Sequence, residues 1–242
     1  MEAKKEKTMI QTPELVELLK AGVHFGHQMS KKYPKMDPYI YTQRSQISII
    51  DLEQTASKLR EAMDFVKKIA SENGVILFVA SKKQAKKIVE EAAKSCGMPY
   101  ITSRWLGGTF TNFGNIVKLP KKLKDLEEKQ ANGQLEKYTK KEQLNFQREI
   151  ERLKEMVEGI KELKKLPEAM YLVDIKKEKT ALAEALNKNI PVVAMTDTNT
   201  DPSKITYPIP ANDDASKSIA IITQAVAAAI SEGRGQTIIS ER

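Results

Sequence analysis

Three short apolar runs place the strongest constraint on how this chain can fold. They are Val75–Ala80, Ala169–Asp174 and Pro191–Thr196, and each is rich in aliphatic side chains. Unbroken runs of this kind are typical of strands that are buried on both faces of a parallel sheet. Helical patterns follow the first two runs. Strand–helix alternation predicts an α/β domain, with a mostly parallel sheet flanked by helices on both faces, as in Rossmann or flavodoxin-like folds.

Further elements extend this pattern. A strand is expected at Ile47–Ile50 and a helix at 52–71, where apolar residues recur near the helical period of 3.6. Tyr207–Pro210 contains two prolines, which lack backbone donors, so we expect a short edge strand there. Hydroxyl side chains cap helices well, and we expect Thr12 to cap the first helix and Ser81 the helix after the Val75–Ala80 strand.

A long segment rich in charged residues, 115–166, separates the two halves of the alternating pattern. From Phe146 to Ile160, apolar residues recur at alternating spacings of four and three, which is the seam of a two-helix coiled coil. Asn132-Gly133 interrupts the helical pattern, so we expect an inserted antiparallel coiled-coil hairpin that projects from the domain. It could be a plain structural pair or an arm that reaches a partner. The expected organisation is a flexible tail at 1–11, one globular domain from 12–114 and 167–233, the hairpin at 115–166, and a flexible tail at 234–242.

Net charge points to the class of partner. The chain has a formal charge of +8 and a pI near 9.3, which favours polyanions such as nucleic acid over an anionic membrane surface. Its single cysteine, Cys96, excludes an intrachain disulfide and suits a reducing compartment. No apolar run approaches the roughly 20 residues of a membrane span, and the charged start has no apolar stretch of a secretory signal behind it. We therefore expect a cytoplasmic protein with no membrane association.

Lysines and tyrosines alternate in the segment that follows the first helix. Residues 31–41 contain three lysines, three tyrosines and two prolines, with Arg44 close behind. The prolines argue against a helix or a central strand. Cations can contact phosphates while aromatic rings offer stacking surface, so the segment suits RNA. The alternative is a surface loop whose tyrosines cover the core. Lys82 and Lys83 open a later helix, against the usual dipole preference, and hint at a nearby anion.

Motifs for common enzyme chemistry are missing from the sequence. Gly107, Gly108 and Gly114 do not have the G-x-G-x-x-G spacing, and there is no G-x-x-x-x-G-K-[ST] phosphate loop. No G-x-S-x-G motif or Cys–His pairing supports a nucleophilic triad. A nucleotide- or metal-dependent α/β enzyme acting on RNA is therefore an alternative without a recognisable catalytic motif.

A divalent metal is the one candidate cofactor. Loops at the carboxyl ends of parallel strands converge on one crevice. His27, Asp197 and Asp213 could together offer nitrogen and oxygen ligands to a structural zinc or magnesium ion. The alternative is that these aspartates cap helices and tighten turns. No cofactor is expected to be required.

The stretch from Arg104 to Asn115 joins the two architectures. It contains the only tryptophan and three of the eleven glycines. We expect Trp105 to pack in the core at the base of the hairpin rather than to stack on a base, and Gly107-Gly108 to permit the turn. Its polar side chains are left to face RNA or to cap the next helix.

Five long motifs, taken together, resemble one protein family: Leu19–His27, Pro34–Met36, Arg104–Asn112, Asp197–Pro202 and Ile209–Asp214. They are similar to the bacterial form of protein two of the small ribosomal subunit, and the resemblance runs from about residue 12 to 233. It implies a non-enzymatic, ribosome-bound protein that is not expected to form homo-oligomers. It also implies binding of small-subunit ribosomal RNA at the head–body junction on the solvent side, contacts with neighbouring ribosomal proteins, and docking of the large messenger-binding ribosomal protein one.

With this resemblance, the basic and polar residues become candidates for RNA contact: Lys31, Lys32, Lys35, Arg44, Lys82, Lys83, Arg104, Thr109, Asn112, Lys121 and Lys122. They would position the protein through phosphates rather than read bases. A third hypothesis is a coiled-coil interaction module whose basic charge is incidental.

Overall fold

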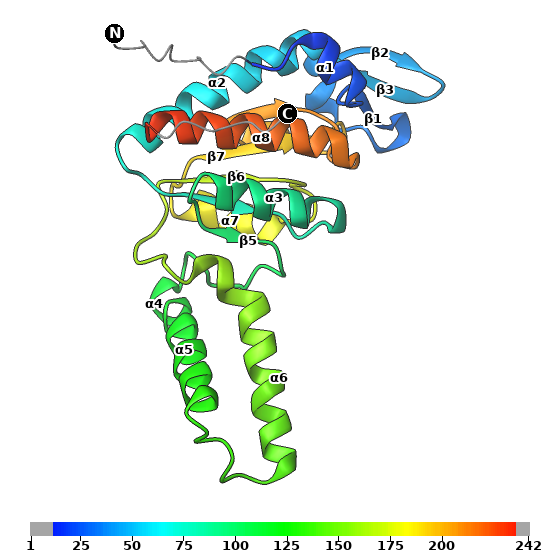
Figure 1. The fold of residues 1–242 in the computed structure, drawn as a ribbon. Helices are drawn as coiled ribbons and strands as arrows, with labels where there is room; N and C mark the ends of the chain where they lie inside the picture. Colours follow the sequence, from blue (N-terminus) through cyan, green and yellow to red (C-terminus); the bar gives the residue numbers. More distant parts are fainter. Residues whose placement is uncertain (1–11, 236–242) are drawn as a thin grey trace, which may run out of the picture.

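The computed structural model describes residues 12–235, so the expected tail at 1–11 and most of the tail at 234–242 lie outside the described residues. Its centre is a five-stranded sheet with the order β5-β4-β6-β7-β8, in which every neighbouring pair is parallel (Figure 1). This confirms the predicted parallel α/β fold. The strands are β4 (Ile76–Val79), β5 (Tyr100–Ile101), β6 (Ala169–Leu172), β7 (Val192–Thr196) and β8 (Tyr207–Pro210).

Alternate residues of each strand build two separate cores. Ile76 and Phe78 face helices α2 (Leu52–Ser71), α3 (Lys83–Ser95) and α8 (Ser216–Gly233), which cover one side of the sheet. Leu77 and Val79 face the other side, where α7 (Lys179–Asn187) packs. Burial on both sides explains why these strands read as continuous apolar runs. The proline-bearing β8 lies at the sheet edge, as predicted.

Two long helices project from the body beside β5, the edge strand of the parallel sheet. They are α5 (Lys118–Ala131) and α6 (Lys140–Val157), which lie side by side in Figure 1 and contact each other. Short α4 (Phe113–Ile116) leads into α5, and the 3₁₀ turn η3 (Glu158–Ile160) returns the chain to the body. Leu123, Leu126 and Leu153 are buried in the same core cluster as Trp105. A strict coiled-coil geometry for the pair stays a prediction.

A second, three-stranded antiparallel sheet was not predicted. It has the order β1-β3-β2, with β1 (Phe25–Gln28), β2 (Ile40–Arg44) and β3 (Ile47–Ile50). The expected strand at 47–50 is therefore present but pairs here, outside the parallel sheet. Ser45 and Gln46 make the β2–β3 turn with φ of 51° and 63°, the positive values that tight hairpin turns require. Between β1 and β2 the chain forms the 3₁₀ turns η1 (Met29–Lys31) and η2 (Pro34–Tyr39), so the prediction of no helix holds only for α-helix.

Both predicted helix caps are wrong. Helix α1 (Leu15–Lys20) is capped by Glu14 rather than Thr12, through a reciprocal capping box with Glu17. The N-cap of α3 is Lys82, because Ser81 N–H and O–H both donate to Glu178 instead. The remaining 3₁₀ turn, η4 (Pro202–Lys204), leads towards β8. Within residues 12–235, no helix is long and apolar enough to cross a membrane.

Candidate nucleic-acid interface

The carboxyl ends of the parallel strands bring many of the predicted site residues to one edge of the sheet. The chain reaches Asp174 just after β6, Asp197 directly after β7, and Asp213 shortly after β8. The small antiparallel sheet is joined to this edge, because the His27 N–H donates to Thr198 Oγ1 at 2.8 Å. Loops far apart in sequence thus form one polar surface, as expected for the carboxyl edge of such a sheet.

Lys82 lies among three aspartates at this edge. Its Nζ is 2.7 Å from Asp213 Oδ1, 2.6 Å from Asp214 Oδ1 and 3.5 Å from Asp174 Oδ2. Burial acts to lower the pKa of Lys82, but hydrogen bonds to Asp213 and Asp214 outweigh it and raise that pKa well above the usual value. Lys82 was expected to contact RNA phosphates. The structure instead commits its charge to internal carboxylates.

Asp213 is the most perturbed carboxyl group of this cluster. Burial raises its pKa, and the nearby charges of Asp197 and Asp174 add to that effect, so that the pKa reaches about 7 despite Lys82. Its backbone N–H donates to Asp197 Oδ2 at 3.3 Å. Within this cluster four carboxylates surround Lys82 and His27, so the cluster itself favours protons or a bound cation.

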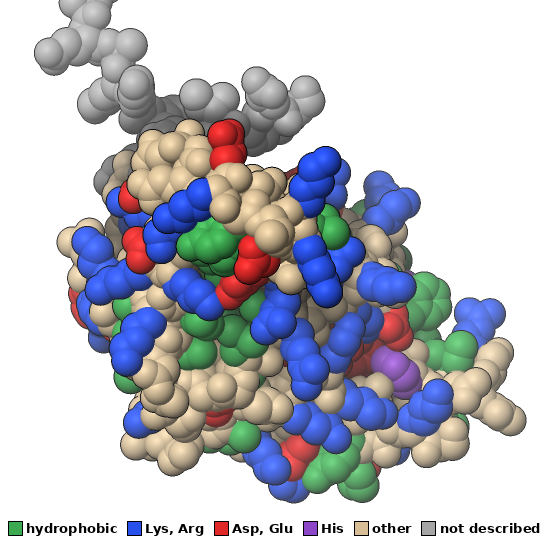
Figure 2. All heavy atoms as spheres, turned by 90° about the horizontal axis from the view of Figure 1, so that it is seen from below, with side chains coloured by type: hydrophobic (Ala, Val, Ile, Leu, Met, Phe, Trp, Pro, Cys, Tyr) green, Lys and Arg blue, Asp and Glu red, His purple; other side chains and the backbone are tan. Residues whose placement is uncertain are grey.

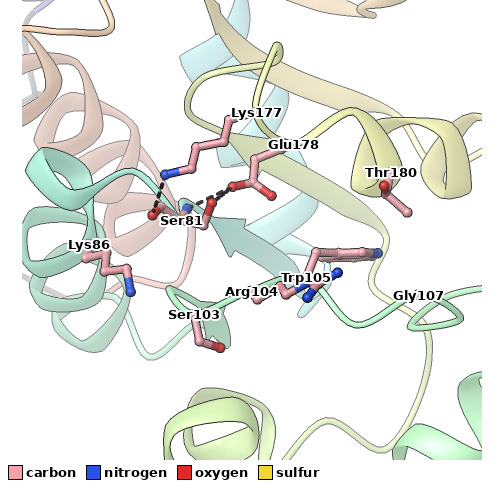
Figure 3. A pocket seen from close by; sticks show the side chains of 9 residues that line it. All are labelled: Ser81, Lys86, Ser103, Arg104, Trp105, Gly107, Lys177, Glu178 and Thr180. Atoms are coloured by element: carbon pink, nitrogen blue, oxygen red, sulfur yellow. Dashed lines mark hydrogen bonds between the residues drawn. The ribbon is translucent and has the colours of Figure 1, made fainter.

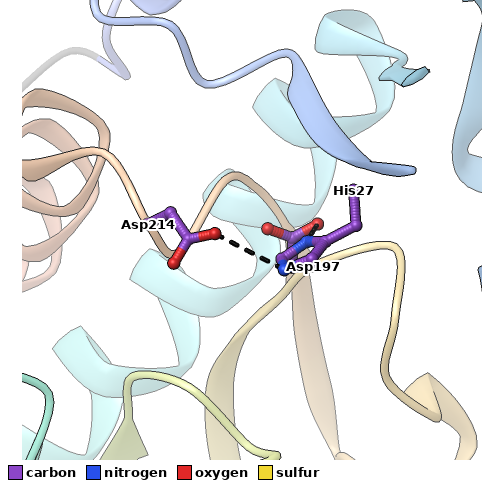
Figure 4. A group of neighbouring side chains, drawn as sticks. All are labelled: His27, Asp197 and Asp214. Atoms are coloured by element: carbon purple, nitrogen blue, oxygen red, sulfur yellow. Dashed lines mark ion pairs between the residues drawn. The ribbon is translucent and has the colours of Figure 1, made fainter. Parts of the chain in front are cut away.

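His27 joins two of the aspartates. Its Nδ1 is 3.0 Å from Asp197 Oδ1 and its Nε2 is 3.4 Å from Asp214 Oδ2 (Figure 4). The hydrogen bond to Asp197 raises the pKa of His27 against the opposing effect of burial. One donor atom from each of His27, Asp197 and Asp214 lies within 4.8 Å of the others. The sequence prediction named Asp213 as the third ligand, but the structure places Asp214 there and turns Asp213 towards Lys82.

Tyr33 and Lys35 meet the loop after β7. Tyr33 Oη donates to Asp201 Oδ2 at 3.1 Å, and Lys35 Nζ lies 3.4 Å from the same atom and 2.8 Å from Ser203 Oγ. Hydrogen bonds from Ser203, then Tyr33, lower the pKa of Asp201 to about 2. This network fixes the lysine-rich segment against the parallel sheet, so its exposed cations are held in a defined place.

The other predicted contact residues divide by exposure. Lys31, Arg44 and Lys83 are exposed around the carboxyl edge, while Lys32 is paired with Asp37. Lys121 and Lys122 are exposed on α5, and Lys122 pairs with Glu149 of α6. Seen from the side on which α5 and α6 project, Figure 2 shows Lys and Arg side chains across much of the surface, with fewer Asp and Glu between them.

Thr109 and Asn112 have different surroundings. Thr109 is buried, and its hydroxyl donates to the Leu106 carbonyl at 2.6 Å. The prediction that Thr109 contacts RNA is therefore wrong, because its buried hydroxyl already donates within the turn. Asn112 is exposed at the N-cap of α4 without a side-chain cap bond, and it stays a candidate. Trp105 is buried, as predicted.

A cavity of about 600 Å³ opens beside the turn that contains Trp105 and Gly107 (Figure 3). Three cationic side chains line it: Arg104 after β5, Lys86 of α3, and Lys177 in the loop after β6. Only Arg104 was on the list of predicted contacts. Lys86 and Lys177 belong to no sequence motif that would predict a binding site. The position of Lys177 just after a predicted strand could nevertheless have placed it at the carboxyl edge of the sheet.

The sequence also matches a known protein family. The family model described as Ribosomal protein S2 matches residues 18–233. The chain belongs to this family. The match spans both halves of the parallel sheet and the two helices between them. Membership identifies a structural protein of the small ribosomal subunit with a part in translation, and it favours that reading over an α/β enzyme.

Proposed function

We propose that the protein binds small-subunit ribosomal RNA through the cations around the carboxyl edge of its parallel sheet. Family membership supports this, and the observation that carries it is the set of cations without carboxylate partners at that edge. Within residues 12–235, Lys31, Lys83 and Arg104 make no ion pair with a carboxylate. Unpaired cations on a folded scaffold neutralise phosphates without first breaking internal bonds.

The β2–β3 hairpin extends the proposed surface. Tyr41 is 76% exposed, and Arg44 is exposed at the end of the same strand. The exposed ring is suited to stacking on an unpaired base, and the guanidinium of the same strand is suited to contacting a phosphate. Lys121 of α5 would add a more distant contact. We place the protein, ribosome-bound in the cytoplasm, at the head–body junction on the solvent side, on the strength of the family resemblance.

We further propose that the protein helps dock ribosomal protein one. A groove of about 460 Å³ suits a protein partner, because its lining includes the apolar side chains of Leu182 and Leu186 and the cations Lys176 and Lys179. This chemistry matches an acidic segment with apolar side chains. Leu186→Glu should weaken capture of purified ribosomal protein one, while Leu144→Glu, at an exposed leucine of α6, should not. Equal capture by both variants would remove the groove from the proposal.

Co-sedimentation with small ribosomal subunits depleted of this protein tests the RNA-binding proposal. We expect binding that falls steeply with salt, because each neutralised phosphate contributes a log–log slope of roughly 0.7 to 0.9. Binding that does not depend on salt would contradict it. Tight binding of a mononucleotide with no binding to subunits would favour the enzyme alternative.

We also propose that His27, Asp197 and Asp214 hold a divalent metal ion. An imidazole nitrogen with two carboxylate oxygens is a donor set that suits zinc. The ion would cross-link β1 to the loops after β7 and β8. It would supply positive charge to the carboxylate cluster and so relieve its repulsion.

A further inference from the structure

The cavity beside Trp105 lies where the order of the parallel strands reverses. From β4 the chain goes first to β5 on one side, and later to β6 on the other. The loops after β4 and β6 therefore diverge, and in open α/β sheets ligands bind in the crevice at such a switch point. Ser81 from the first loop and Lys177 from the second both line this cavity (Figure 3).

The charges in the cavity are not balanced by carboxylates. Within the described residues, Lys86, Arg104 and Lys177 make no ion pair. Lys177 Nζ instead donates to the Ser81 carbonyl at 3.0 Å. The one carboxylate in the lining, Glu178, is 3% exposed and accepts the N–H and O–H of Ser81. Three cations thus line the cavity without a carboxylate partner.

Neighbouring Lys82 shows the contrast. It follows Ser81 directly, yet its charge is taken by three aspartates on the other side of the same loop. The switch point is therefore divided into an acidic half around Lys82 and a cationic cavity around Arg104. Three cations in a hollow, rather than on a flat face, select for a compact multivalent anion that can accept several hydrogen bonds at once.

We propose that this cavity binds the phosphate group of a nucleotide unit. Its volume of about 600 Å³ lies within the range of sites for small organic ligands, so it admits a sugar and base along with the phosphate. The nucleotide belongs to the bound RNA strand, in which case the inference rests on the proposed function. Free mononucleotide offers the same phosphate chemistry, and the experiment separates the two sources.

The test compares two double variants with equal loss of charge, and a third variant adds a carboxylate to the cavity. Lys86→Gln/Lys177→Gln removes two cations from the cavity, while Lys68→Gln/Lys87→Gln removes two exposed lysines of α2 and α3 that do not line it. Thr180→Glu adds a carboxylate to the lining at the first turn of α7, where an acid favours helix formation. Circular dichroism and thermal melting check that each variant folds.

Binding is measured to protein-free small-subunit ribosomal RNA, to AMP and to inorganic phosphate. We expect the cavity variants to lose roughly 10- to 100-fold in RNA affinity and about one unit of log–log salt slope, with the control within about threefold. Millimolar AMP or phosphate binding that only the cavity variants lose identifies free nucleotide as an additional source. Cavity and control variants that behave alike with every probe overturn the inference, even if wild-type RNA binding and its salt dependence stand. Wild-type protein that binds no RNA refutes the proposed function. The AMP and phosphate measurements then decide by themselves whether the cavity binds a phosphate group.

Discussion

The indole Nε1 of Trp105 donates to Glu184 Oε1 at 3.1 Å, and both side chains are buried. The same carboxylate accepts the backbone N–H groups of Gly108 at 2.7 Å and Phe110 at 2.8 Å, with further bonds from Thr111. One acid of α7 thus accepts hydrogen bonds from four residues of the turn that leads into the projecting helices.

Removal of this acceptor should destabilise the fold. Burial acts to raise the pKa of Glu184, but the hydrogen bonds from Phe110, Gly108 and Trp105 together lower it. The carboxylate is therefore ionised at neutral pH, and both of its oxygens accept hydrogen bonds. Glu184→Ala leaves several buried N–H groups unpaired, and we expect a loss of about 3 kcal/mol in the free energy of unfolding. Urea denaturation measures it. Glu155→Ala, at an exposed position of α6, is the control, and equal effects of the two would refute the role of Glu184.

Trp105 itself should contribute to stability more than to RNA binding. Its ring meets Phe110 edge-on, with centroids 5.1 Å apart. Trp105→Ala is expected to cost about 3 to 5 kcal/mol of unfolding free energy, and Trp105→Phe less, because it keeps most of the apolar contact. Chemical denaturation of the isolated protein gives both values. Loss of RNA binding with unchanged stability would reverse the assignment.

Acid should release the contact between Tyr33 and Asp201. Because the folded pKa of Asp201 is lowered to about 2, its contribution is present above the unfolded pKa near 4 and lost as pH falls towards 2. Asp201→Asn should cost about 1 kcal/mol at pH 7, and the difference from wild type should vanish near pH 2. Stability curves from pH 2 to 7 measure this. Asp64→Asn, at an exposed site on α2, should show no such convergence.

Metal binding distinguishes two adjacent aspartates. If His27, Asp197 and Asp214 hold zinc, then Asp214→Asn should lower the affinity at least tenfold, whereas Asp213→Asn, whose side chain faces Lys82, should lower it less. His27→Ala should abolish binding. Metal analysis of the purified protein and calorimetric titration with zinc provide the measurements. A metal-free wild-type preparation that gives no heat on titration would end the proposal.

These outcomes show where sequence patterns are informative. The strands β4, β6 and β7 were predictable because burial on both faces demands continuous apolar residues, and the pattern is local. The antiparallel sheet was not, since β2 has exposed residues at most positions and its pairing depends on tertiary contacts. Glu184 could not be foreseen, because an acid in a helix ordinarily faces solvent and its partners lie more than 70 residues away. Asp213 and Asp214 are neighbours in sequence, and only the backbone direction decides which one faces His27.

Gly159 offers a test of how the projecting helices are joined to the body. It lies in η3, and a Cβ atom there would come within 2.1 Å of the Tyr100 carbonyl oxygen and 2.7 Å of its ring. The backbone of Tyr100 cannot shift as easily as a flexible side chain could, so η3 would have to move away from β5. We expect Gly159→Ala to cost about 2 kcal/mol or more of unfolding free energy. Gly114→Ala is the matched control, since nothing lies within 4 Å of its added Cβ and alanine favours the helical conformation of α4 by up to about 1 kcal/mol. Thermal and urea unfolding should therefore shift in opposite directions for the two variants. A Gly159→Ala protein as stable as wild type would show that the junction between η3 and β5 is loosely packed.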